Sequence, residues 1–143
     1  MILITGANGH LGSATIDFLL KKIPANKIRA LVRSEEKGAG LKAKGVGIAI
    51  GDYFNHDSLL AAMKGIDTLM LISSSSITGR HEQHANVIRA AKEAGVKQIV
   101  YSSVLKSSAD SKFTAGIDHA KTEEDIKASG IEYTIMGKKK FII

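Results

Sequence analysis

The sequence has 143 residues, a length typical of one domain with a sizeable hydrophobic core. It is 44% apolar and 24% charged and contains no cysteine, which excludes a disulfide framework and a thiolate metal site. The net charge is +6, but Lys138, Lys139 and Lys140 supply half of it, and the other basic residues are scattered among acids with few aromatics. We therefore expect a solvated surface rather than a nucleic-acid interface.

The apolar runs are short. The longest, such as residues 69–72, fall far below the roughly 20 residues that a membrane-spanning helix needs. The first expected strand begins at Ile2, which leaves no room for a signal peptide. Together with the lack of cysteine, these features predict a protein of the reducing cytoplasm with no membrane partner.

Short runs of β-branched residues and leucine alternate along the chain with segments of helical period. Strands are expected at 2–5, 28–32, 46–50, 68–72, 98–102 and 132–136. Helices are expected from Leu11 to Leu19 with a stop near Pro24, over 34–44, after an N-cap at Asn55 or Asp57, over 81–94, and over 117–129. The strands are continuously apolar, as burial on both faces of a parallel sheet requires, so we predict a doubly wound α/β domain.

The segment TGANGHLG, residues 5–12, lies between the first expected strand and the first expected helix. Gly6 permits a tight turn, Gly9 omits a Cβ where a phosphate would approach, and Gly12 lets helix and strand pack closely. The N–H groups and the positive dipole end of such a helix suit a pyrophosphate. The strand before and the helix after this motif favour a dinucleotide site over a plain turn. The remaining candidate contacts in the turn are Asn8, His10 and Leu11.

The end of the second expected strand distinguishes between the two dinucleotides. An NAD site usually carries Asp or Glu there to bind the ribose hydroxyls. This sequence has Arg33 followed by Ser34, and the planar arginine fork is suited to a 2′-phosphate. NADP(H) is therefore favoured as the cofactor. The alternative is a solvated surface arginine near Glu35 and Glu36.

The segment GDYFN, residues 51–55, follows the third expected strand, where an adenine would lie. Asp52 is a candidate acceptor for the exocyclic amine, with Tyr53 or Phe54 beside the ring. A turn that ends in a helix N-cap explains the same residues equally well. Both interpretations stay open at this point.

Two other clusters carry weaker signals. Ser73, Ser74 and Ser75 follow the fourth expected strand, at the edge where a cofactor lies in such sheets. His81 and His84 lie one helical turn apart, but no third ligand is evident, so no metal site is expected.

The motifs GANGHLG, VR after the second strand, GDY, AGVKQIVYSS and AKTEEDIKASGIEYTIM together resemble the atypical short-chain dehydrogenases of the NmrA-like branch. Within that branch they are most similar to the bacterial NAD(P)H:quinone oxidoreductases of type 2. The resemblance covers residues 1–136 and implies a Rossmann-type domain that binds NADPH and passes hydride to a quinone. The family's glycines correspond to Gly6, Gly9 and Gly12, and its phosphate-reading arginine to Arg33.

The resemblance also assigns a lysine. The lysine that contacts the nicotinamide ribose in ordinary short-chain dehydrogenases corresponds to Lys121, but the position of their catalytic tyrosine, four residues earlier, is Ile117. Reducing an isolated ketone needs a positioned acid, whereas a reduced quinone is a delocalised anion that water can protonate. The missing tyrosine thus disfavours a ketone reductase and a sugar-nucleotide epimerase. His119 is a candidate replacement acid, and an exposed helical residue is the alternative interpretation.

Residues 137–143 form a Lys-rich tail that differs from the continuation found in the family. We therefore expect the family's substrate-binding subdomain to be missing from this sequence, with catalysis impaired and NADPH binding retained. An open edge at the last strand favours association, as in a homodimer. The alternative function is a non-catalytic, NADP(H)-binding regulator that senses redox state and acts through protein partners.

Overall fold

The computed structural model describes residues 1–72, 80–103 and 114–137, which form one parallel sheet with helices on both faces. The sheet order is β3-β2-β1-β4-β5-β6, and every neighbouring pair is parallel. The strands are β1 (Ile2–Ile4), β2 (Ile28–Val32), β3 (Gly47–Ile50), β4 (Thr68–Ile72), β5 (Gln98–Ser103) and β6 (Glu132–Gly137). This confirms the predicted doubly wound, Rossmann-type fold.

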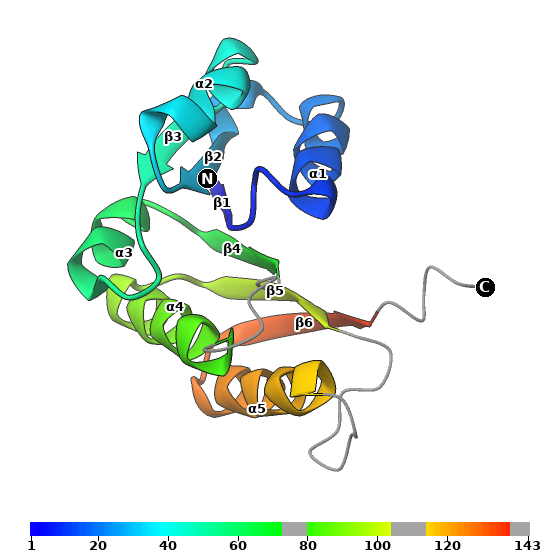
Figure 1. Cartoon of the computed structure of the whole chain (residues 1–143), viewed down its shortest axis with the longest axis vertical. Coiled ribbons are helices and arrows are strands. Elements are labelled where there is room, and N and C mark those ends of the chain that lie inside the picture. The colour runs from blue at the N-terminus through cyan, green and yellow to red at the C-terminus, as the bar shows by residue number, and fades with distance from the viewer. Residues whose placement is uncertain (73–79, 104–113, 138–143) are drawn as a thin grey trace.

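Helices connect successive strands, as Figure 1 shows. They are α1 (His10–Leu20), α2 (Glu35–Ala43), α3 (His56–Ala62), α4 (Arg80–Ala94) and α5 (Thr114–Ala128), with a 3-10 turn, η1 (Ala25–Lys27), before β2. The expected elements are all present, and their bounds differ from the prediction by one to three residues where they differ at all. Among the described residues, no helix combines the length and the apolar character needed to cross a bilayer.

The core has two layers, one on each face of the sheet. Neighbouring residues of β1 point to opposite layers. Leu3 belongs to the layer covered by α3, α4 and α5, and Ile4 belongs to the layer covered by α1 and α2. Both side chains are fully buried. Burial on both faces explains why the strands lack the in-and-out alternation of a half-exposed sheet.

The strand order reverses beside β1. The chain first builds β2 and β3 on one side of β1 and then places β4 on its other side. Thr5 links the end of β1 to β4 here, because its N–H donates to the Met70 carbonyl at 3.1 Å and its Oγ1 accepts from the Ile72 N–H at 3.0 Å. In open α/β sheets, ligands bind at the carboxyl ends of the strands where the order reverses.

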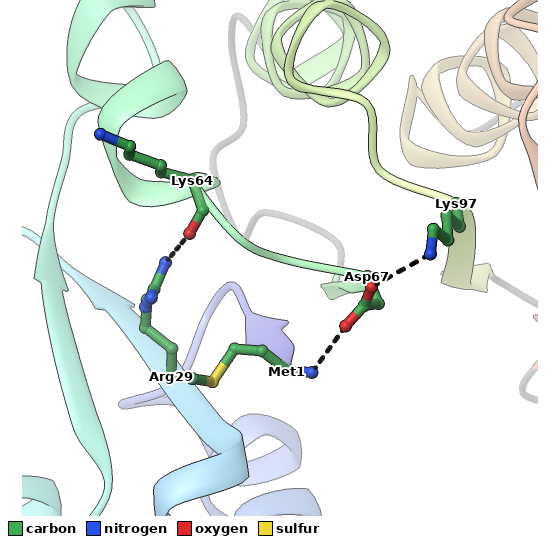
Figure 2. A network of polar contacts seen from close by, with 5 residues as sticks. All are labelled: Met1, Arg29, Lys64, Asp67 and Lys97. Carbon is green, nitrogen blue, oxygen red and sulfur yellow. Dashed lines mark hydrogen bonds and ion pairs between the residues drawn. The ribbon is translucent and has the colours of Figure 1, made fainter.

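The opposite end of the sheet is held by polar contacts among residues far apart in the sequence. Asp67 accepts from the Met1 amine at 2.9 Å and lies 3.7 Å from Lys97 Nζ, as Figure 2 shows. In the same view, Arg29 Nη1 donates to the Lys64 carbonyl at 2.8 Å. These contacts join the starts of β1, β4 and β5 and lie at the end of the sheet away from residues 5–12.

Candidate functional site

The glycine turn follows β1 and leads directly into α1. Gly6 has a φ of 60°, a left-handed conformation that favours glycine, and the Gly9 N–H donates to the Gly6 carbonyl at 3.1 Å. A Cβ on Gly12 would lie 2.0 Å from the Gly6 carbonyl oxygen, so no other residue fits there without a shift of backbone. The close packing predicted for Gly12 therefore involves the turn itself.

Gly9 differs from its neighbours in the turn. A Cβ there would make only an ordinary contact, 3.5 Å from the Gly6 oxygen, and Gly9 is exposed. The chain's own packing thus leaves room for a side chain at this position. A glycine here keeps the surface of the turn open to an approaching molecule.

The amino end of α1 has no side-chain cap. Its N-cap is Gly9, and its first turn holds no acid, whereas α2 is capped by the Ser34 hydroxyl and α3 by the Asn55 carbonyl group. Both of those helices also carry at least one acidic residue in the first turn. The first N–H groups of α1 and the positive end of its dipole therefore have no side-chain partner within the described part of the chain. Asn8, His10 and Leu11 are exposed around this helix end.

Arg33 lies at the carboxyl end of β2 with its side chain exposed. It forms no ion pair with Glu35, Glu36 or another described residue. The adjacent Ser34 hydroxyl accepts from the Lys37 N–H at 3.3 Å and so serves the start of α2. The guanidinium is thus available to an anion at this edge of the sheet.

The loop after β3 forms the turn that the sequence allowed. The Asp52 Oδ1 atom accepts from the Phe54 N–H at 2.8 Å, and the Asp52 N–H donates to Ser58 Oγ at 3.0 Å. Asn55, rather than Asp57, caps α3. Asp52 and Phe54 remain exposed, with Phe54 at 54%, so the turn leaves both side chains accessible from solvent.

Tyr53 points the other way. Its half-buried ring packs against the core layer of α3, α4 and α5, and this burial raises the pKa of its hydroxyl above the usual value. The nearby polar groups of Thr5 and of the Gly6 backbone lower that pKa in part, as does the charge of Arg33. The phenol therefore reaches the base of the glycine turn, and Phe54 is the aromatic residue on the exposed side of the loop.

Helix α4 contributes contacts that sequence reasoning missed. Asn86 Nδ2 donates to the Tyr53 carbonyl at 2.9 Å. On another side of α4, buried His84 lies 3.0 Å from Thr122 Oγ1 of α5 and meets the Tyr101 ring edge-on at 5.7 Å. The apolar period of α4 indicates which turns face inward, but it does not identify the partners of a polar residue, which here lie tens of positions away in the sequence.

The candidate residues at the nicotinamide end are only partly described. Lys121 is exposed on α5, next to the buried Thr122. His119 lies in α5, and its side chain is outside the described part, as are the loop residues Ser73, Ser74 and Ser75. The roles predicted for these residues stay predictions.

The histidines that raised the question of a metal site have other partners. His81 Nε2 lies 2.7 Å from Asp125 Oδ2, a contact that links α4 to α5 as the contact between His84 and Thr122 does. Within residues 1–72, 80–103 and 114–137, no three metal-ligating side chains gather in one place.

A family model described as NAD(P)H-binding matches residues 6–141, which include the glycine turn and all later strands and helices. The chain belongs to this NAD(P)H-binding family. The resemblance to NmrA-like proteins that the motifs indicate agrees with this match and with 31% identity over 138 residues to an NmrA-like family domain-containing oxidoreductase of Aspergillus flavus, covering 92% of this chain and 45% of that protein.

Curated relatives and solved structures agree with this assignment. The chain is 43% identical over 136 residues to quinone oxidoreductase 2 of Escherichia coli strain K12, covering 95% of this chain and 47% of that protein. It is 32% identical over 137 residues to an NAD(P)H azoreductase of Xenophilus azovorans, covering 95% and 46%. The chain therefore spans about half the length of the curated relatives it matches.

Two solved structures superpose closely. The NADPH complex of the Escherichia coli NADPH-dependent quinone oxidoreductase matches with a TM-score of 0.89 and 44% identity, over 94% of this chain and 47% of that one. The NADP(H) complex of a Citrobacter sp. triphenylmethane reductase matches with a TM-score of 0.89 and 39% identity, over 94% and 48%. Both similarities extend over almost the whole of this chain.

Proposed function

We propose that the chain binds NADPH at the glycine turn and belongs to an oxidoreductase that passes hydride to a quinone. The observation that carries the proposal is the amino end of α1, which is uncapped and is approached through a turn where Gly9 leaves open space. Such an end is a preformed anion site, because several N–H groups and the helix dipole converge on it. The cofactor-bound relatives described above support the same interpretation.

The residues around the turn fit the parts of NADPH. The N–H groups of His10, Leu11 and Gly12 would hold the pyrophosphate, and Arg33 would pair with the 2′-phosphate through its planar fork. Asp52 and Phe54 would receive the adenine from the exposed side of the loop after β3. When bound, the reduced nicotinamide supplies a hydride.

The other end of the cofactor extends toward β4 and β5 in this proposal. Ser73, Ser74 and Ser75 would border it, and Lys121 would hold the nicotinamide ribose. His119 would serve as a proton donor if the acceptor needs one. These assignments derive from the family resemblance and from the position of the residues along the chain.

A quinone fits the chemistry better than an isolated ketone does. No tyrosine lies four residues before Lys121, so the usual proton donor for an alkoxide is missing. The relatives named above are a quinone oxidoreductase, an azoreductase and a triphenylmethane reductase. Quinones and azo compounds are conjugated acceptors that delocalise the incoming charge, and in a triphenylmethane dye the hydride neutralises a carbocation. Holding donor and acceptor together is then the main task of the protein.

A second function stays open. A protein that binds NADP(H) without turnover, senses its redox state and acts through partners would use the same turn and the same Arg33. The missing tyrosine is compatible with it, since sensing needs no acid. For both functions we propose the cytoplasm, where NADPH is available, as the location.

Turnover distinguishes the two functions. We would follow NADPH absorbance in the presence of the purified chain and a soluble benzoquinone, with Arg33→Ala as the matched variant. Quinone-dependent oxidation that Arg33→Ala weakens supports the reductase. NADPH binding without oxidation fits the sensor and also a reductase whose substrate-binding part is missing, so the Kd values of NADPH and NADP⁺ are then compared. A clear difference between these two Kd values favours the sensor, equal values favour the reductase, and no binding of NADPH contradicts both.

A further inference from the structure

Helix α4 holds the loop after β3 and the start of α3 through two side chains. Asn86 Nδ2 donates to the Tyr53 carbonyl at 2.9 Å, and Glu93 Oε2 lies 2.6 Å from His56 Nε2. Asn86 and Glu93 are two helical turns apart and so lie on the same side of α4. One side of this helix therefore touches the loop and α3, while His81 and His84 contact α5.

The two contacts fix different parts of the segment. Glu93 is exposed and pairs with the first residue of α3. Asn86 is half-buried and reaches the middle of the loop, at the residue between Asp52 and Phe54. Only the second contact therefore acts on the backbone that presents these two side chains.

Tyr53 connects Asn86 with the region of the glycine turn, because its carbonyl accepts from Asn86 and its ring extends toward the turn. At the start of the loop, the Gly51 N–H donates to the Val32 carbonyl of β2 at 2.9 Å. The loop is otherwise held by bonds within itself and to Ser58, such as the Asn55 N–H to the Asp52 carbonyl at 3.0 Å. These bonds fix the start of the loop and set its shape, but they do not fix the position of its middle against the sheet. The Tyr53 ring in the core and the amide of Asn86 on its carbonyl do fix that position.

We propose that Asn86 is a positioning residue for the adenosine end of the cofactor site. By holding the Tyr53 carbonyl, it keeps Asp52 and Phe54 at the rim and the Tyr53 ring beneath the glycine turn. Asn86 acts through Tyr53 and not by contact with the nucleotide. The inference rests on the proposed function and adds to it a residue from a helix outside the nucleotide-binding motifs.

The amide at position 86 is needed as a donor. Alanine would leave the Tyr53 carbonyl without its partner, and a polar group that loses its partner in a partly buried place costs stability. Aspartate would place a carboxylate oxygen, which only accepts hydrogen bonds, against the Tyr53 carbonyl oxygen, which also only accepts them. Both substitutions should release the loop, whereas loss of Glu93 should loosen only the start of α3.

The test uses the full chain with Asn86→Ala and Asn86→Asp, and with Glu93→Ala as the control. Two ligands are titrated: NADPH and adenosine 2′,5′-bisphosphate, which carries the adenosine end alone. In both Asn86 variants we expect the Kd of each ligand to rise by roughly three- to tenfold, the loss typical of one hydrogen bond. In Glu93→Ala both Kd values should stay at the wild-type level, even if its Tm falls as far as that of the Asn86 variants.

Hydrogen exchange of the ligand-free chain gives a second measurement. The amides of Phe54 and Asn55 should exchange faster in the Asn86 variants than in the wild type or in Glu93→Ala. Unchanged Kd values in the Asn86 variants, or an equal rise in Glu93→Ala, would overturn the inference. If the wild type binds neither ligand, the proposed function fails, and the exchange rates still decide whether Asn86 holds the loop.

Discussion

At the residue scale, the site depends on three glycines. The backbone conformation and packing of the turn require glycine at two of these positions but not at the third. Gly6 is held in a left-handed conformation and Gly12 lies against the Gly6 carbonyl, whereas Gly9 has room for a Cβ. The first two shape the turn. The third leaves space for the phosphate that we propose there.

Gly12 and Gly40 form a matched pair for testing the turn, because both are helical glycines. Gly12→Ala would bring a Cβ to 2.0 Å from the Gly6 oxygen, while a Cβ on Gly40 meets nothing within 4 Å. We expect Gly12→Ala to lower the free energy of unfolding by roughly 1–3 kcal/mol through overpacking, and to weaken NADPH binding.

Gly40→Ala should instead raise the free energy of unfolding by about 0.5–1 kcal/mol, because alanine is the better helix former. It should leave NADPH binding unchanged. Urea unfolding of both variants measures the two effects. Equal stability of Gly12→Ala and the wild type would contradict this account of the turn.

Some of the site could be predicted from single residues, and some could not. Arg33 follows a strand and lies about 20 residues past the glycine turn, so its position is given by local order alone. That Arg33 makes no ion pair with Glu35 or Glu36 is not given by local order, because it depends on how α2 begins. The contact between Asn86 and Tyr53 joins residues 33 positions apart, and no local pattern indicates it.

At the element scale, the strands and helices were predictable because local period and burial agree. Strands such as 68–72 are apolar throughout, and the helices carry caps and stop signals that the structure confirms. The end of β1 differs from the prediction because a side chain competes there with regular structure. Thr5 was expected in the first strand, but β1 ends at Ile4 and the Thr5 hydroxyl bonds to the end of β4.

The cap of α3 gives a prediction at this scale. The Asn55 Oδ1 atom accepts from the Ser58 N–H at 3.1 Å, so Asn55→Ala should lower the free energy of unfolding by about 1 kcal/mol. Asn55→Asp keeps an acceptor and a favourable charge at the helix start and should stay near the wild type. Thermal unfolding compares the variants, and equal losses in both would show that the cap does not stabilise α3.

At the scale of the whole molecule, the two ends of the sheet have different tasks. Candidate cofactor residues lie at the carboxyl ends of β1, β2 and β3, and ion pairs around Asp67 join the amino ends of β1, β4 and β5. The homodimer expected from an open sheet edge stays a prediction, as do the domain limits at 136. Among the described residues, β6 has a strand neighbour on one side only.

Asp67 gives a pH dependence with a definite sign. Its hydrogen bond to the Met1 amine, together with that charge, holds the pKa of the carboxyl below its usual value. A lowered folded-state pKa means that the stabilisation is fully present above the ordinary pKa of Asp and is lost as pH falls through the folded-state pKa.

Asp67→Asn should therefore unfold more easily than the wild type at neutral pH, and the difference should shrink in acid. Urea unfolding at a series of pH values measures the difference. A difference that does not change with pH would rule out the ion pair as its source.

The most direct test of the central claim is a fluorescence titration of the purified chain with NADPH and with NADH, repeated on Arg33→Ala. We expect the wild type to bind NADPH more tightly than NADH. Arg33→Ala should weaken NADPH binding by roughly ten- to a hundredfold, as loss of a charge-assisted hydrogen bond implies, and leave NADH binding unchanged. Equal affinity for the two nucleotides, or a preference that survives Arg33→Ala, would contradict the proposed site.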